Sequence, residues 1–250
     1  MLPSPVVRAP GAWREVTLRD PATTYPDAVP STDQGAVHVA LLGDSIFDNA
    51  AYTHGMPDVV TFLRGRLPVG GRATLLAADG STTSDVSERQ VATLPADVTH
   101  AVVSMGGNDA LLNAEALDLP IDSTRDALSL FGVRASAFET SYRRALDAIL
   151  DRVPMAAVCT IYNPHLQTEE AALTRVGLMM FNDVILRTAL DHGVPVIDLR
   201  LVIVDPDDYA NPLEPSSRGG EKIARSITAA LGLCGPTAPV SQVFGLAEGA

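Results

Sequence analysis

The sequence predicts an α/β fold in which a parallel sheet is covered by helices on both faces. Three observations support this prediction: short apolar runs alternate with helical patterns, the runs are almost continuously hydrophobic, and 46% of the residues are hydrophobic. Strands buried on both faces have this near-continuous hydrophobicity, whereas half-exposed strands alternate apolar and polar residues. Strands that alternate with helices are typical of a doubly wound α/β/α sandwich.

Five apolar runs are expected to form the strands, at residues 37–42, 74–78, 101–104, 156–161 and 194–199. Apolar residues spaced three or four apart predict the helices between them. The four clearest stripes are Val59, Phe62, Leu63 and Leu67; Phe138, Tyr142, Leu146 and Ile149; Leu173, Val176, Met180 and Val184; and Ile223, Ile227 and Leu231. Gly193 and Gly232 follow the last two stripes, as helix-ending glycines do.

The two ends of the chain lack the alternating strand and helix patterns of the rest of the sequence. Residues 1–34 hold six of the 18 prolines and little periodicity, which predicts an extended arm. Residues 35–234 are expected to form one α/β domain, and residues 235–250 a loose tail. The start has no cationic segment followed by an apolar one, so a cytoplasmic protein is expected.

Charge and composition exclude several classes of partner. The formal net charge is -12 and there is no basic cluster, so neither nucleic acid nor an anionic membrane surface is an expected partner. No apolar run approaches the roughly 20 residues that span a bilayer. The two cysteines, Cys159 and Cys234, lie in no metal-ligand or redox motif, so no metal is expected. A small molecule is the expected partner.

Ligands of doubly wound sheets bind beyond the carboxyl ends of the strands, where this chain carries three short polar motifs. Ser45 follows the first strand in Gly43-Asp44-Ser45-Ile46 and is either a nucleophile on a tight turn or a helix N-cap. Gly80 follows the second strand and Asn108 the third; each is an oxyanion donor or an ordinary turn residue. Together they provide a nucleophile and three oxyanion donors, the requirements of acyl transfer.

These motifs resemble the sequence blocks of the SGNH (GDSL-type) hydrolase superfamily over about residues 36–232. Ser45 matches the nucleophile, Gly80 the oxyanion glycine, and Asn108 the oxyanion asparagine in Gly106-Gly107-Asn108-Asp109. The resemblance implies a flavodoxin-like three-layer α/β/α sandwich with a five-stranded parallel sheet. It also implies hydrolysis of an acyl ester or thioester through an acyl-enzyme, without metal or organic cofactor. Asp44, beside the serine, is grouped with the substrate-binding residues.

The last block of the family is an Asp, two residues, and a His followed by Pro-Ser. Here Asn211 stands at the Asp position and Glu214 at the His position, while the frame continues from Pro215. A glutamate is about two pKa units less basic than a histidine, which makes proton transfer roughly 3 kcal/mol harder. Glu214 could instead form only a surface ion pair with Arg218 or Lys222.

Four interpretations follow from this departure. Glu214 itself is the base, held by Asn211 and raised in pKa by burial. Alternatively, a histidine from elsewhere reaches Ser45: His165 follows the fourth strand, and His54 lies in the loop after the serine. In the third, the oxyanion site serves another acyl or carbonyl chemistry. In the fourth, the protein is a ligand-binding relative without catalysis.

Two further segments bear on the substrate and on the base. Residues 110–135 are rich in leucine and form either a mobile lid or apolar pocket wall, or an ordinary packed helix. A lid would suit a short to medium acyl group better than a polar sugar. Asp205, Asp207 and Asp208 stand in a loop rich in Pro and Asp, which is expected to be a solvated turn.

Overall fold

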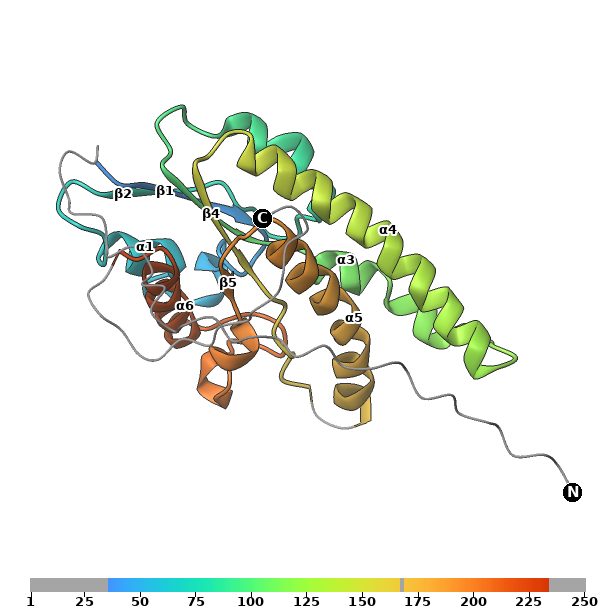
Figure 1. The fold of residues 1–250 in the computed structure, drawn as a ribbon. Helices are drawn as coiled ribbons and strands as arrows, with labels where there is room; N and C mark the ends of the chain where they lie inside the picture. Colours follow the sequence, from blue (N-terminus) through green and yellow to red (C-terminus); the bar gives the residue numbers. More distant parts are fainter. Residues whose placement is uncertain (1–35, 167–168, 234–250) are drawn as a thin grey trace, which may run out of the picture. The chain divides into compact units, whose positions relative to one another are not determined.

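The computed structural model describes residues 36–166 and 169–233 and confirms the predicted α/β fold. The proposed arm, residues 1–34, and tail, residues 235–250, lie outside the described residues. The five strands are parallel and lie in the order β2-β1-β3-β4-β5 (Figure 1). Their bounds are β1 His38–Gly43, β2 Arg72–Leu75, β3 His100–Ser104, β4 Met155–Cys159 and β5 Val196–Ile197.

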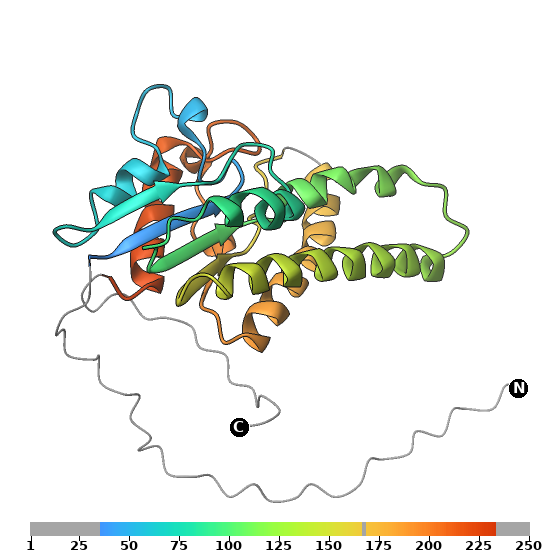
Figure 2. The same ribbon diagram turned by 90° about the horizontal axis from the view of Figure 1, so that it is seen from above.

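The helices form a layer on each side of this sheet (Figures 1 and 2). On one side α1 and α6 pack together, and on the other α4 and α5 do so. The bounds are α1 Val59–Arg64, α2 Thr83–Asp85, α3 Gly107–Leu112, α4 Thr124–Leu150, α5 Glu169–Asp191 and α6 Ser217–Ala230. A π-helical turn, Val86–Gln90, follows α2. Among the described residues, no helix combines the length and apolar composition needed to cross a membrane.

The strands are buried on both faces, as their continuous hydrophobicity predicts. Successive β1 side chains enter opposite cores, because side chains alternate across a strand. Ala40 and Leu42 join the core of α4 and α5, whereas Val39 and Leu41 join that of α1 and α6. The layers on both faces therefore hold the strand ends, where the polar motifs lie, in place.

The predicted stripe on α5 is only partly buried. The buried residues of this helix begin at Leu178, and Val184 is among them. Leu173 and Val176, which continue the stripe toward the N-terminus, are 58% and 63% exposed. The first turns of α5 therefore extend beyond the core, so periodicity identified the helix but not the length of its buried part.

The order of the strands reverses at β1, which has β2 on one side and β3 on the other. At such a switch point the two loops that leave neighbouring strands diverge and leave a crevice. Gly43, the last residue of β1, pairs with Ser104, the last of β3. Gly43 has φ +124°, and a Cβ there would lie 1.7 Å from the Ser104 carbonyl oxygen, so glycine alone fits.

Candidate active site

Ser45 lies two residues beyond Gly43, in the crevice at the switch point. Ser45 is 7% exposed and lines a deep cavity of mixed polar and apolar residues. The Gln90 side chain accepts the Gly43 N–H at 2.7 Å and donates to the Gly43 carbonyl at 2.8 Å. The Asp44 N–H donates to the Ser104 carbonyl at 3.2 Å. These bonds fix the backbone that carries the serine. Sequence reasoning missed Gln90, because no motif surrounds it.

The three expected oxyanion donors differ in their surroundings. The backbone N–H groups of Ser45 and Gly80 form no hydrogen bond within the described part of the chain. Asn108, on the first turn of α3, lines the cavity and donates one amide hydrogen to the Ser81 carbonyl at 2.9 Å, leaving its second hydrogen available. Gly80 is exposed in the turn after β2, with φ +78°, and is not among the cavity-lining residues.

Glu214 lies in a short hairpin, residues 209–215, closed by an antiparallel bridge between Tyr209 and Pro215. The Ala210 N–H donates to the Glu214 carbonyl at 2.9 Å, and the Asn211 side-chain oxygen accepts the Glu214 N–H at 2.9 Å. Asn211 therefore holds the backbone of Glu214 rather than its carboxylate. Both residues line the same cavity as Ser45.

The carboxylate of Glu214 faces the cavity without a cationic partner among the described residues. Its Oε2 atom is buried and has no hydrogen-bond partner there. Burial raises the pKa of Glu214, the negative charge of Asp79 adds to this, and a side-chain interaction with Ser45 opposes it. The structure thus places the Glu214 carboxyl group and Ser45 in the same cavity.

The neighbouring cations are engaged elsewhere. Lys222 donates at 2.7 Å to both Asp205 and Asp208, and Arg218 donates to Asp207 at 3.0 Å. The alternative of a surface ion pair for Glu214 is therefore not observed. The expectation of a solvated acidic turn was wrong for Asp208, which is completely buried. Its buried charge is balanced by Lys222, which the sequence places a full turn into the next helix.

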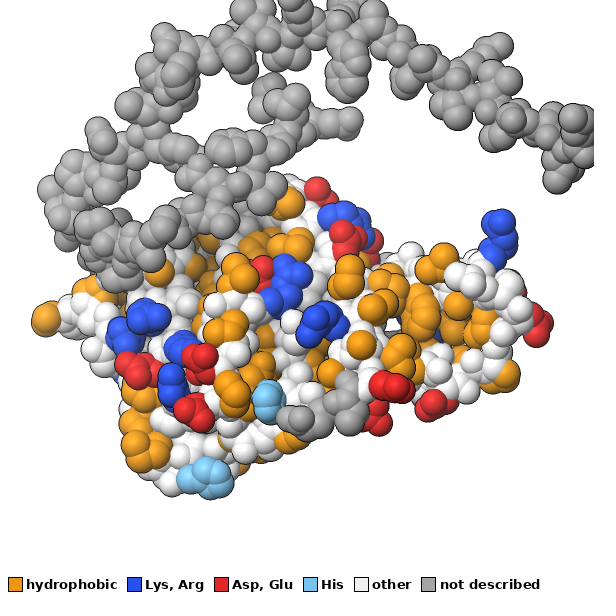
Figure 3. Space-filling view, turned by 90° about the horizontal axis from the view of Figure 1, so that it is seen from below, with side chains coloured by type: hydrophobic (Ala, Val, Ile, Leu, Met, Phe, Trp, Pro, Cys, Tyr) orange, Lys and Arg blue, Asp and Glu red, His pale blue; other side chains and the backbone are white. Residues whose placement is uncertain are grey.

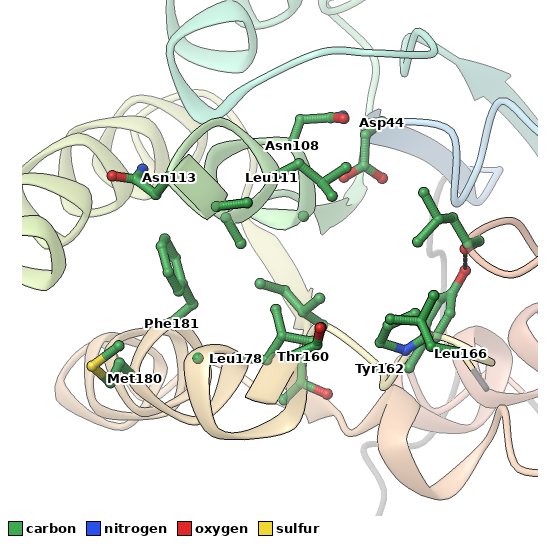
Figure 4. A pocket seen from close by; sticks show the side chains of 18 of the residues that line it. Asp44, Asn108, Leu111, Asn113, Thr160, Tyr162, Leu166, Leu178, Met180 and Phe181 are labelled. Atoms are coloured by element: carbon green, nitrogen blue, oxygen red, sulfur yellow. Dashed lines mark hydrogen bonds between the residues drawn. The ribbon is translucent and has the colours of Figure 1, made fainter. Parts of the chain in front are cut away.

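Asp44 is a second carboxyl group in the cavity. It is 3% exposed, and its Oδ1 accepts the Ile46 N–H at 3.2 Å. Figure 4 shows its side chain on the same wall as Asn108, directed into the cavity. Burial raises the pKa of Asp44 to about 7, and the charges of Glu214 and Asp109 add to the shift.

The two candidate histidines lie outside the cavity lining. His165 is exposed; its ring lies beside Tyr209 at a centroid distance of 5.2 Å, and its backbone N–H donates to the Pro212 carbonyl at 2.8 Å. His54 is exposed in the loop after Ser45, with φ 53°. Neither lines the cavity with Ser45.

The cavity has a volume of about 520 Å³ and is largely apolar. In Figure 4 its walls face each other across an open space, with Leu111 on α3 opposite Leu178 and Phe181 on α5. Part of the segment 110–135 contributes to the wall, including Phe131 of α4. Arg134 is the one cationic side chain among the described lining residues, and it is paired with Glu115 at 2.9 Å.

Apolar side chains continue from the cavity onto the surface. In Figure 3 they gather on the part of the molecule that lies to the right, where α4 begins in Figure 1. The exposed residues there include Leu117, Leu119, Ile121, Leu128 and Val133. The segment that lines this part of the cavity thus also carries exposed apolar side chains.

Comparison with solved structures finds the same fold in several esterases and lipases. A lipase from a goat rumen metagenome is 20% identical, with TM-score 0.61, and the match covers 78% of this chain and 97% of that one. An extracellular lipase from Streptomyces rimosus is 17% identical, with TM-score 0.59 and coverage of 78% and 100%. A catalytic mutant of an acetylxylan esterase from Geobacillus stearothermophilus is 17% identical, with TM-score 0.59 and coverage of 81% and 97%. Identities this low show the fold alone.

The sequence itself was compared in two ways. A search of curated proteins finds no match. The sequence model of the GDSL-like lipase/acylhydrolase family matches residues 41–221, which include Ser45, Gly80, Asn108 and Glu214. This match spans most of the chain and the whole of the described site, and so the chain belongs to the GDSL-like lipase/acylhydrolase family, whose members are hydrolases.

Proposed function

We propose that this chain is a serine-dependent ester hydrolase in which Glu214 serves as the general base. The observation that carries the proposal is the Glu214 carboxylate, which lines the same cavity as Ser45, has a buried oxygen without a hydrogen-bond partner and has no cationic partner among the described residues. A carboxylate whose pKa is raised is a stronger base than an ordinary one, which reduces its disadvantage relative to histidine.

In the proposed reaction, Glu214 takes the hydroxyl proton of Ser45 while the serine oxygen bonds to the ester carbonyl carbon. The oxyanion that forms accepts hydrogen bonds from the N–H groups of Ser45 and Gly80 and from the Asn108 amide. The intermediate then collapses: the bond to the alcohol breaks, and the leaving oxygen takes the proton from Glu214. Water attacks the acyl-enzyme in the same way, with Glu214 first accepting and then returning the proton to Ser45.

The apolar cavity supports an acyl group as the part of the substrate that it holds. Most of its lining residues are apolar (Leu, Ile, Phe, Met, Ala and Pro), and burying an acyl chain against them is favourable by roughly 0.8 kcal/mol per methylene group. Asn211 acts through the backbone of Glu214, and Asp44 lines the cavity beside Ser45. We propose a short to medium acyl ester, or the corresponding thioester, as the substrate.

Hydrolysis of p-nitrophenyl butyrate by the wild type, Ser45→Ala and Glu214→Gln tests this function. Both variants are expected to lose roughly 10²–10⁴-fold or more in kcat, because each removes a partner in proton transfer. His165→Gln and His54→Gln are the matched controls and are expected to retain activity. Loss of activity in either histidine variant, with Glu214→Gln active, would assign the base to that histidine.

The pH profile adds a second test. Glu214 must be deprotonated to act, so activity is expected to rise with pH through its raised pKa and to fall in more acidic solution. An inert wild type whose Ser45→Ala variant keeps the affinity for an acyl ligand would instead identify a binding protein. Acyl transfer to an alcohol in place of water would indicate non-hydrolytic acyl chemistry.

A further inference from the structure

The side chain of Asn49 connects two loops that are far apart in the sequence. Asn49 is 0% exposed and lies four residues after Ser45, in the same segment that leaves β1. Its Oδ1 accepts the N–H of Val59, the first residue of α1, at 3.0 Å. Its Nδ2 donates to the carbonyl of Pro215 at 3.2 Å. Both ends of the amide are thus used inside the protein.

Pro215 directly follows Glu214 in the hairpin 209–215. The other outside bonds to the carbonyls of this hairpin come from the loop after β4: the Tyr162 hydroxyl donates to Leu213, and the His165 N–H donates to Pro212. Among the hydrogen bonds of the described residues, the bond from Asn49 is the one that joins the hairpin to the loop of Ser45.

The space around Asn49 is closely fitted. A Cβ at Gly220 of α6 would lie 3.4 Å from Asn49 Nδ2 and 3.2 Å from Val59 Cγ2. The Asn49 amide thus lies beside the first turn of α6, where a side chain larger than glycine would crowd it. Its two hydrogen bonds, to the Val59 N–H and the Pro215 carbonyl, fix its orientation. A second bond, from the Ser217 hydroxyl to the Pro57 carbonyl at 2.7 Å, joins the same segments farther from Glu214.

We propose that Asn49 is a positioning residue that sets the separation between Ser45 and Glu214 by holding the Pro215 carbonyl. This inference rests on the proposed function of Glu214. While the backbone on both sides of Glu214 is held by Asn211 and Asn49, the carboxylate itself has an oxygen that no described group occupies. The base is thus fixed through its backbone and free at its reacting end, which is how proton-transfer groups are kept aligned without losing basicity.

Asn49→Leu tests the proposal, because leucine has a similar volume and forms neither hydrogen bond. Ser217→Ala is the matched control, since it removes the other bond between the same segments. The first readout is independent of catalysis: carboxyl-carbon NMR titration of Glu214, whose resonance is identified by its loss in Glu214→Gln. Asp44, Asp79, Tyr52 and Tyr162 also face Glu214 and are unchanged in both variants.

A released hairpin would admit water, so the pKa of Glu214 is expected to fall toward its ordinary value in Asn49→Leu and to stay raised in Ser217→Ala. With p-nitrophenyl butyrate, kcat is expected to fall roughly ten- to a hundredfold in Asn49→Leu, with KM little changed. The acidic limb of its pH profile is expected to shift to lower pH, because the pKa of Glu214 is lower. If Asn49→Leu does not fold, Asn49→Ala takes its place.

A folded Asn49 variant with an unchanged Glu214 pKa and kcat within about twofold of the wild type would overturn the proposal. An equal effect of Ser217→Ala on both quantities would also overturn it, because the Asn49–Pro215 bond would then only stabilise the contact between the two segments, as the Ser217–Pro57 bond does. An ester-inactive wild type whose Glu214 pKa still falls in Asn49→Leu would leave the positioning role in place and reject the proposed hydrolysis.

Discussion

The residues that distinguish this site are two carboxyl groups in a cavity with little positive charge. Burial is the main cause of the raised pKa at both Asp44 and Glu214, and the Glu214 charge also acts on Asp44. Groups that interact in this way are driven apart in pKa, so that one holds its proton while the other has lost it. Asp44, with a pKa of about 7, is therefore partly protonated in neutral solution.

This difference predicts how Asp44→Asn changes stability with pH. Folded Asp44 binds its proton up to about pH 7, whereas the unfolded chain releases it near 3.8, so folding takes up a proton between these values. The free energy of unfolding therefore falls as pH rises across this window, by up to about 4 kcal/mol. Between about pH 5 and about pH 8, the free energy of unfolding measured with urea should fall by about 3 kcal/mol more in the wild type than in Asp44→Asn.

Asp118→Asn, which removes an exposed carboxyl group, is the control for that comparison and should retain the wild-type pH dependence. Burial lowers the pKa values of His38 and His100, which gives a dependence of opposite sign in this pH range that is common to all three proteins. Equal pH dependence in the wild type and Asp44→Asn would contradict a raised pKa at this position.

At the scale of elements, α4 and α5 each serve two purposes along their length. The C-terminal part of α4 buries Tyr142 and Leu146 against the sheet, whereas Phe131, nearer its start, lines the cavity. In α5 the buried residues also begin only at Leu178. The parts that extend beyond the core therefore form walls of the cavity.

Gly177 of α5 gives a direct way to shorten the cavity. It lines the cavity, and a Cβ there would meet no atom within 4 Å. Gly177→Leu should therefore reduce kcat/KM for p-nitrophenyl octanoate far more than for the acetate, roughly tenfold more. Replacing a helical glycine should also stabilise the fold by up to about 1 kcal/mol. Kinetics across a series of acyl lengths provides the measurement.

The matched control is Gly132→Leu on α4, where a Cβ also meets nothing but the residue does not line the cavity. This variant should gain similar helix stability and keep the wild-type preference for acyl length. If both variants changed that preference equally, the effect would come from the helices in general rather than from filling the cavity.

At the scale of the whole molecule, the chain is acidic, and part of its negative charge lies near the loop that carries Ser45. The net charge is -12, and Asp48, Asp79 and Glu214 surround Tyr52 near the serine loop. The hydrogen bond to Asp79, with burial and the charge of Glu214, raises the pKa of Tyr52 to about 12. Such a field repels anionic substrates and attracts cationic ones.

We therefore expect butyrylthiocholine to have a higher kcat/KM than its neutral isostere, S-(3,3-dimethylbutyl) thiobutyrate, by about tenfold at low salt. The ratio should approach one as ionic strength rises from about 0.01 M to about 1 M, because salt screens the charges. Asp79→Asn should lower the ratio at low salt. A ratio that does not change with salt would show that the acidic groups have no influence on the choice of substrate.

The sequence by itself determined the fold class, the succession of strands and helices along the chain, and the motifs around Ser45, Gly80 and Asn108. These features are local or periodic: buried strands are continuously apolar, and each motif directly follows a strand. The family match over residues 41–221 confirms the family that these motifs indicated. The roles of individual site residues, Glu214 above all, stay predictions for the experiments described above.

Only the tertiary structure decided which residues share a cavity. Glu214 has Arg218 and Lys222 nearby in sequence, yet both pair with other carboxylates, while His165 and His54 lie outside the cavity lining. Gln90 and Asn49 carry no sequence signal at all, because they act through hydrogen bonds to backbone 47 and 166 residues away. Periodicity and motifs describe neighbours along the chain, whereas burial, pKa and alignment depend on neighbours in space, which folding alone brings together.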